Sequence, residues 1–190
     1  MDHYSFKCRA CGSANLKPVI SLGLSPLANN LLNSEDDTDE LYPLEMSYCP
    51  DCHNCQLSFV VPARKMFDHY LYVASTTRSF RNHFKQAAKK YINDFYLKPD
   101  SLVVDIGSND GIALKPFQDK KIKILGVEPA KNIAKMALEQ NIETIDKYFT
   151  VEVAKEIVEK HGNADLVTAS NVFAHADNLI EIANGAFKML

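Results

Sequence analysis

The chain has 190 residues, of which 24% are charged and 46% hydrophobic, and its formal net charge is −3. This length accommodates one full domain and a small module, and the low charge gives no broad electrostatic footprint for nucleic acid. No apolar run approaches the ~20 residues needed to span a membrane, and Met1-Asp2-His3-Tyr4 lacks the features of a signal peptide. We therefore expect a cytoplasmic protein whose cysteines are reduced ligands or core residues.

All five cysteines lie within residues 1–61, a loop-rich segment with little helical periodicity. Two thiolates from one C-x-x-C turn can each reach a metal at ~2.3 Å, and two such turns complete a tetrahedron. A four-thiolate site has no open position, so its metal is structural. The spacing predicts a zinc-ribbon-like module over residues 1–61 with four zinc ligands: Cys8, Cys11, Cys49 and Cys52.

Two other interpretations of these cysteines stay open, namely reduced thiols packed in a core and a redox-active C-x-x-C pair. Cys55 forms a further C-x-x-C with Cys52, but it precedes an expected strand over residues 56–61, which favours a packed core thiol. His53 is either a substitute ligand or an exposed turn residue. Residues 25–30 are expected to form a turn and a short exposed segment.

Residues 62–98 are predicted to form a helical connector with an active-site loop. Pro62 can open the segment, and apolar residues from Phe80 to Phe95 recur at three- and four-residue steps, as on one face of a helix. The hydroxyl-rich stretch Tyr70–Thr77 interrupts this period. A tyrosine-bearing loop ahead of a cofactor domain could cover an active site, and a plain connector with Tyr72 packed on the core is the alternative.

From residue 99 to residue 190 the pattern alternates between strands and helices, which predicts an α/β domain with a mostly parallel, Rossmann-like sheet. The expected strands cover 102–106, 123–128, 143–145 and 165–170. The expected helices begin near Gly111, cover about 131–140 and 150–160, and begin again near Asn178.

The loop after the first of these strands predicts a cofactor site, because α/β sheets bind ligands past the carboxyl ends of their strands. Asp105-x-Gly107-x-Asn109-x-Gly111 resembles motif I of the class I S-adenosylmethionine-dependent methyltransferases. Its glycines would let the backbone approach the methionine part of the cofactor. Glu128 closes the second strand, where a carboxylate can accept both ribose hydroxyls. A dinucleotide fingerprint needs tighter glycine spacing, so the pattern favours S-adenosylmethionine.

The loop after the fourth strand also lies on the ligand side of the sheet. Asn171 is a candidate for lining the cofactor pocket. His175 lies near the expected reaction centre and has the right pKa range to accept a proton at neutral pH. The alternative is a histidine that orders the loop by hydrogen bonding.

Together these segments resemble the zinc-binding sugar C-methyltransferases, which act on nucleotide-linked 4-keto deoxysugars. The resemblance implies removal of a proton next to the ketone and methyl transfer from S-adenosylmethionine to the resulting enolate. It also implies that Tyr72 and His175 belong to the active site, and that the zinc module helps to form the substrate side. The matching segments are Cys8-x-x-Cys11-Gly12, Cys49-x-x-Cys52, Gln56-Leu57, Tyr70-Leu71-Tyr72 with Ser75-Thr76, Val104–Gly111, Gly126–Pro129 and Asn171–His175.

Members of this family continue beyond the fourth strand, into a part that carries a tyrosine–glutamate–histidine cluster with the favoured general base. We therefore expect a partial methyltransferase domain, truncated after the fourth strand and helix and weakly active or inactive alone. Its exposed sheet edge could pair with another chain. Two further hypotheses stay open: a non-catalytic zinc- and cofactor-binding module that works with a partner, and a methyltransferase for another small molecule.

Overall fold

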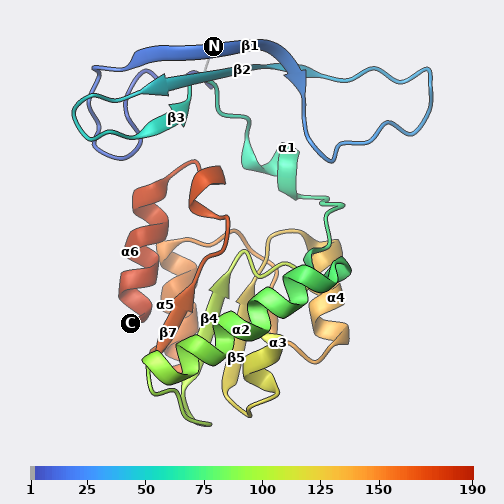
Figure 1. Ribbon diagram of the computed structural model, residues 1–190, viewed down its shortest axis with the longest axis vertical. Coiled ribbons are helices and arrows are strands. Elements are labelled where there is room, and N and C mark those ends of the chain that lie inside the picture. Colours follow the sequence, from blue (N-terminus) through green and yellow to red (C-terminus); the bar gives the residue numbers. More distant parts are fainter. Residues whose placement is uncertain (1–2) are drawn as a thin grey trace. The chain divides into compact units, whose positions relative to one another are not determined.

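The computed structural model describes residues 3–190, which fold into two compact units. One unit contains the chain up to Met66 together with Asp177–Ile180, and the other contains Phe67–Ala176 and Glu181–Leu190. Figure 1 shows the strands and helices of each unit. Across the described residues, no helix is both long and apolar enough to cross a membrane.

The first unit is built on an antiparallel sheet with the strand order β1-β2-β3. Its strands are β1 (Lys17–Pro26), β2 (Leu41–Tyr48) and β3 (Cys55–Leu57). The predicted turn at residues 25–30 is wrong in its first half, because Ser25 and Pro26 still pair with β2. A proline is tolerated there because it ends an outer strand. The side chains of β1 are almost all exposed, so this sheet buries little apolar surface of its own.

The second unit contains a parallel sheet with the strand order β6-β5-β4-β7. Its strands are β4 (Leu102–Ile106), β5 (Lys123–Val127), β6 (Thr144–Ile145) and β7 (Leu166–Thr168). The chain adds β5 and β6 on one side of β4 and then returns to add β7 on the other side. This reversal is the switch point of a doubly wound sheet, and ligands bind at the carboxyl ends of the strands beside it. The predicted α/β fold is thereby confirmed.

Helices cover both faces of this sheet. Alternate residues of β4 point to opposite faces and therefore pack against different helices. Val104 and Ile106 join one core cluster with residues of α5 (Val151–His161) and α6 (Leu179–Met189). Val103 joins the other cluster with residues of α2 (Arg78–Asp94). Residues of the turn leading into α3 (Lys115–Gln118), of α3 itself and of α4 (Lys131–Glu139) complete that second cluster.

The helical connector has the interruption that the sequence predicts, whereas the helix expected from Gly111 is shorter than its pattern indicates. Residues 62–98 form α1 (Ala63–Phe67), a loop, the short η1 (Ala74–Thr76) and α2, which Thr77 caps by accepting a hydrogen bond from the Phe80 N–H. The helix expected from Gly111 begins only at Lys115. Gly111 has a φ of +83°, a left-handed conformation that starts a turn and not a helix.

Candidate functional site

The four predicted zinc ligands lie together, and their Sγ atoms are all within 4.8 Å of one another. The Sγ atoms of Cys8 and Cys52 are 3.5 Å apart, and those of Cys11 and Cys49 are 3.7 Å apart. A tetrahedral zinc ion with bonds of about 2.3 Å requires sulfur–sulfur distances of about 3.8 Å. The cluster therefore has the dimensions of a four-thiolate zinc site.

The two cysteine turns have the same backbone geometry. In each turn the residue after the second cysteine donates its N–H to the carbonyl of the first, from Gly12 to Cys8 and from His53 to Cys49, both at 2.8 Å. Both donor residues are left-handed, with φ of +77° at Gly12 and +62° at His53. His53 occupies a turn position outside the four-sulfur cluster, and its Nδ1 is hydrogen-bonded to the Tyr48 hydroxyl.

Cys55 is exposed, so the expectation of a packed core thiol is wrong. Alternation along β3 instead turns Gln56 inward, where it is 4% exposed. Its Oε1 accepts the Arg9 N–H at 2.8 Å, and its Nε2 donates to the Lys7 carbonyl at 3.0 Å. Gln56 thus holds the first cysteine turn against the strand that follows the second.

The protonation of the cysteine cluster also favours a bound cation. Burial opposes ionisation of Cys8, but the backbone N–H groups of Cys11 and Ala10 lower the pKa of its thiol to about 6. The backbone at Asn54 lowers the pKa of Cys52, yet the neighbouring thiols, chiefly Cys11, raise it overall to about 12. The protein alone therefore does not support four thiolates side by side, whereas a divalent metal would stabilise them.

The predicted cofactor loop adopts a left-handed conformation at every second residue. The φ angles are +66° at Gly107, +50° at Asn109 and +83° at Gly111. A Cβ atom at Gly107 would lie 2.6 Å from Val172 Cγ2, and one at Gly111 would lie 2.4 Å from Ile142 Cδ1. A side chain at either glycine would therefore clash with its neighbours as well as take up a strained backbone conformation.

Asp105 lies in β4 and is only 2% exposed. Its Oδ1 accepts a hydrogen bond of 2.6 Å from the Thr168 hydroxyl, which joins β4 to β7 next to the start of the loop. Burial, with a smaller contribution from the charge of Glu128, raises the pKa of Asp105 to about 7 in spite of that hydrogen bond. A carboxyl group at this position changes charge near neutral pH.

Glu128 follows β5 and is 6% exposed. Its Oε1 accepts the Ala130 N–H and its Oε2 accepts the Asn109 N–H, both at 2.9 Å. Burial raises the pKa of Glu128, while these two N–H groups act in the opposite direction. Each oxygen retains a lone pair, so the carboxylate can still accept a ligand's hydroxyl groups.

Two buried polar atoms of the loop have no hydrogen-bond partner within residues 3–190, namely Ser108 Oγ and Asp110 Oδ1. Ser108 Oγ packs against Gly126 of β5, where a Cβ atom would lie 2.4 Å from it. Buried polar groups are nearly always paired, so the Asp110 carboxyl is available to a polar ligand group, and the carboxylate of Glu128 can accept the hydroxyl groups of a nucleoside. The residues present therefore fit S-adenosylmethionine.

A segment that we name the strap, Tyr70–Ala74, lies against this loop. The Ala74 N–H donates to Asn109 Oδ1 at 2.8 Å, and Asn109 Nδ2 donates to the Tyr72 carbonyl at 3.0 Å. Asn132, in the first turn of α4, makes a similar pair with the N–H and the carbonyl of Tyr70, at 3.3 and 2.6 Å. Sequence reasoning missed Asn132, for which an amide side chain four residues after Glu128 is the only signal.

The other two loop candidates lie after β7. Asn171 is left-handed, with a φ of +57°, and exposed, and His175 is exposed in η2 (Phe173–His175). The His175 ring is 6.4 Å from the ring of Phe67, which lies 5.5 Å from that of Tyr70. The ring of Tyr70 lies 6.1 Å from that of Tyr72. The two predicted catalytic residues thus end one row of aromatic rings.

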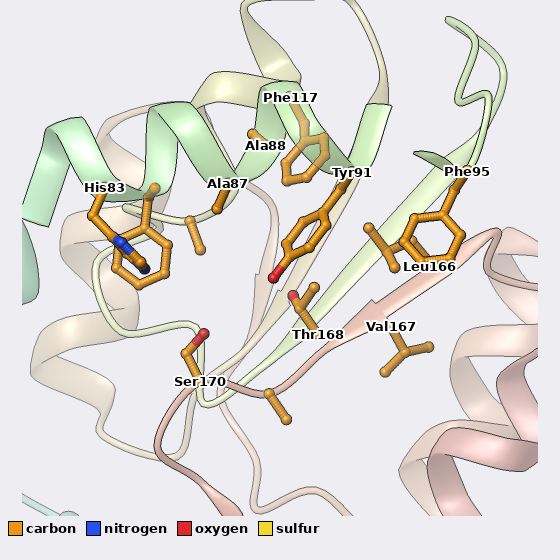
Figure 2. A pocket seen from close by; sticks show the side chains of 13 residues that line it. His83, Ala87, Ala88, Tyr91, Phe95, Phe117, Leu166, Val167, Thr168 and Ser170 are labelled. Carbon is orange, nitrogen blue, oxygen red and sulfur yellow. The ribbon is translucent and has the colours of Figure 1, made fainter. Parts of the chain in front are cut away.

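A pocket of about 340 Å³ lies between α2 and β7 (Figure 2). The side chain of Tyr91 reaches it from α2 and that of Phe95 from the residue after α2, and five successive residues, Leu166–Ser170, line its other side. β7 pairs only with β4 in the described part of the chain. None of the residues of the candidate cofactor loop Asp105–Gly111 lines this pocket.

Replacing one cysteine of the cluster tests the metal site. We expect Cys8→Ser to lose most of its zinc and to destabilise the first unit, because a serine hydroxyl is a poor zinc ligand and metal binding is coupled to folding. Metal analysis after gel filtration measures the zinc content. Cys55→Ser is the matched control and should retain about one zinc per chain. Full zinc in Cys8→Ser would contradict the assignment of the ligands.

The buried carboxyl of Asp105 predicts a pH dependence of stability. Its pKa is about 7 when folded and 3.8 when unperturbed, so the folded state holds the extra proton between these values, and stability falls as the pH rises through that window. Between pH 6 and pH 8 the wild type should lose about 1 kcal/mol of unfolding free energy through deprotonation of Asp105, and Asp105→Asn should not show that loss. Urea unfolding at both pH values measures this, with the exposed Asp100→Asn as control. An unchanged slope in Asp105→Asn would refute the prediction.

Comparisons with known proteins find a zinc-binding domain in the first part of the chain and a methyltransferase domain in the rest. Residues 8–67 match the family model described as "Putative zinc binding domain", and residues 77–190 match the model described as "Methyltransferase domain". The C-methyltransferase NovU of Streptomyces niveus is 38% identical over 186 residues, which are 97% of this chain and 44% of NovU. The chain therefore spans less than half the length of this curated relative.

Solved structures of methyltransferases are similar at a greater distance. A SAM dependent methyltransferase from Archaeoglobus fulgidus is 24% identical, with a TM-score of 0.43, over 56% of this chain and 48% of that one. The plantazolicin methyltransferase BpumL, in complex with a desmethylPZN analogue and SAH, is 18% identical, with a TM-score of 0.48, over 60% of this chain and 44% of that one. The assignment rests on the family models, of which the second covers more than half of the chain. The expected resemblance is thereby confirmed, and the chain belongs to the methyltransferase domain family, with a zinc-binding domain ahead of the methyltransferase domain.

Proposed function

We propose that this chain provides the zinc module and the cofactor domain of an S-adenosylmethionine-dependent C-methyltransferase that acts on a nucleotide-linked 4-keto deoxysugar. The observation that carries the proposal is the loop Asp105–Gly111 joined to the buried carboxylate of Glu128, in a chain that also carries a four-cysteine cluster. The relative named C-methyltransferase aligns with almost the whole chain and supports this combination.

Bound S-adenosylmethionine would supply the methyl group. Glu128 would accept the ribose hydroxyls, with its carboxylate held in place by the N–H groups of Asn109 and Ala130. Gly107 and Gly111 set the course of the loop beside it. Asp105 fixes the end of β4, where the loop begins, through its hydrogen bond with Thr168 of β7. Asn171, which follows β7, would line the cofactor site.

The acceptor chemistry follows from the ketone of the proposed sugar. A ketone acidifies the neighbouring C–H bond, and removal of that proton gives an enolate whose carbon is the nucleophile. The imidazole of His175 is exposed and would belong to the active site beside the acceptor sugar. The phenol of Tyr72, 42% exposed at the other end of the aromatic row, can donate a hydrogen bond to the enolate oxygen.

The zinc would be structural in this account, because four thiolates leave no open coordination position for a substrate. The site needs its thiols reduced, and reduced thiols persist in the cytoplasm. We therefore place the protein in that compartment, without a role for nucleic acid or membrane binding.

Calorimetric titration with S-adenosylhomocysteine tests the cofactor assignment directly. We expect one site per chain in the zinc-loaded wild type and at least about tenfold weaker binding in Glu128→Gln, a loss of about 1.4 kcal/mol. Glu139→Gln, at the exposed end of α4, is the matched control and should bind like the wild type. Absence of binding by a folded, zinc-loaded wild type would contradict the cofactor assignment and with it the proposed function.

We also propose self-association through the edge of β7. In the described part of the chain β7 has a partner strand on one side only, and an unpaired strand edge favours pairing with another strand. Light scattering during gel filtration should show a molar mass that rises from monomer toward dimer as the concentration increases. A constant monomer mass over a hundredfold concentration range would exclude this proposal.

A further inference from the structure

The strap has few buried side chains, and four hydrogen bonds join its backbone to the side chains of Asn109 and Asn132. Among its five residues only Ala74 is buried, while Leu71 is 48% and Tyr72 is 42% exposed. A segment with so little apolar anchorage opens at low free-energy cost. The hydrogen bonds that Asn109 and Asn132 make with the strap backbone therefore carry much of what keeps it in place.

Both asparagines are connected to the same carboxylate. The Asn109 N–H donates to Glu128 Oε2, and the Ala130 N–H, two residues before Asn132, donates to Glu128 Oε1. The first hydrogen bond fixes the left-handed backbone of Asn109, whose side chain is bonded to the backbone of Tyr72 and Ala74. The second sets the start of α4, from which Asn132 holds Tyr70. Each oxygen of Glu128 thus supports one of the two attachments.

We propose that Asn109 and Asn132 are positioning residues that place the strap, and with it Tyr72, and that Glu128 couples this placement to cofactor binding. The coupling rests on the proposed function, whereas the attachment of the strap does not. A ligand that binds the carboxylate in its present orientation stabilises both N–H contacts and hence both asparagines. By linkage, a strap that is held in place strengthens binding of that ligand by the same factor.

Amide hydrogen exchange, resolved at single residues by NMR, tests the attachment without any ligand. In zinc-loaded full-length protein, Asn132→Ala should speed exchange at the Tyr70 amide about three- to tenfold, the size expected for lost hydrogen bonds. Exchange at the buried Val104 amide should not change. Asn93→Ala, an exposed asparagine of α2, is the matched control. An unchanged Tyr70 amide in Asn132→Ala would overturn the attachment.

Glu128→Gln tests the coupling, because Glu128 touches neither end of the strap directly. A glutamine can accept only one of the two N–H groups, so exchange should accelerate at Tyr70, at Ala74 or at both. S-adenosylhomocysteine should slow exchange at both amides in the wild type, and Asn132→Ala should weaken its binding about three- to tenfold. Binding of equal strength in Asn132→Ala and wild type would overturn the coupling.

The outcomes keep the two proposals separate. If the wild type binds no S-adenosylhomocysteine, the proposed function and the coupling fail, while faster exchange at Tyr70 in Asn132→Ala still supports the attachment. If the wild type binds the ligand but Asn132→Ala changes neither exchange nor affinity, the proposed function stands and this inference fails.

Discussion

The candidate cofactor site of the second unit depends on one buried carboxylate, which accepts backbone N–H groups from two separate segments of the chain. Glu128 accepts one hydrogen bond from the loop after β4 and one from the residue that caps α4. An ionised carboxylate is costly to bury unless its oxygens are paired, so the two N–H groups and the carboxylate need one another. Burial still raises the pKa of Glu128, which shows that the pairing offsets only part of that cost. A ligand that supplies two hydroxyl groups would offset more of it, which is the physical basis for placing a ribose there.

The first unit depends on a different constraint, because its sheet leaves most side chains of β1 exposed. Little apolar burial is available to stabilise it, and a metal held by four thiolates supplies what the core does not. The unit and the cofactor domain are thus stabilised by unlike means, one by coordination and the other by burial on both faces of a parallel sheet. Because of this difference, the cysteine spacing alone predicts the first unit and the apolar runs alone predict the second.

The features that local sequence patterns encode were predicted well. The run around Val103 and Val104 is apolar on both sides, and only a strand buried on both faces needs that pattern. The spacing of Cys8 to Cys11 and of Cys49 to Cys52 lets one tight turn supply two ligands to one ion, so the sequence alone predicts the cluster. The expected strands of the α/β domain all exist, with the later ones shorter than predicted because pairing ends before the apolar pattern does.

What the sequence could not show are contacts between segments distant in the chain. Cys55 was the residue expected to be buried, and only the register of β3 against β2 turns Gln56 inward instead. Gly111 was predicted as a cofactor glycine, and nothing in the sequence indicated that Ile142 packs where a side chain at Gly111 would lie. Asn132 has no motif of its own, and its importance appears only once the strap lies beside α4.

An experimental structure of the zinc-loaded protein with S-adenosylhomocysteine tests the central claim most directly. We predict both ribose hydroxyls within hydrogen-bond distance of the Glu128 carboxylate, with the N–H groups of Asn109 and Ala130 still bonded to it. A ligand bound elsewhere on the sheet, or a Glu128 side chain turned away from both N–H groups to reach the ligand, would contradict the account.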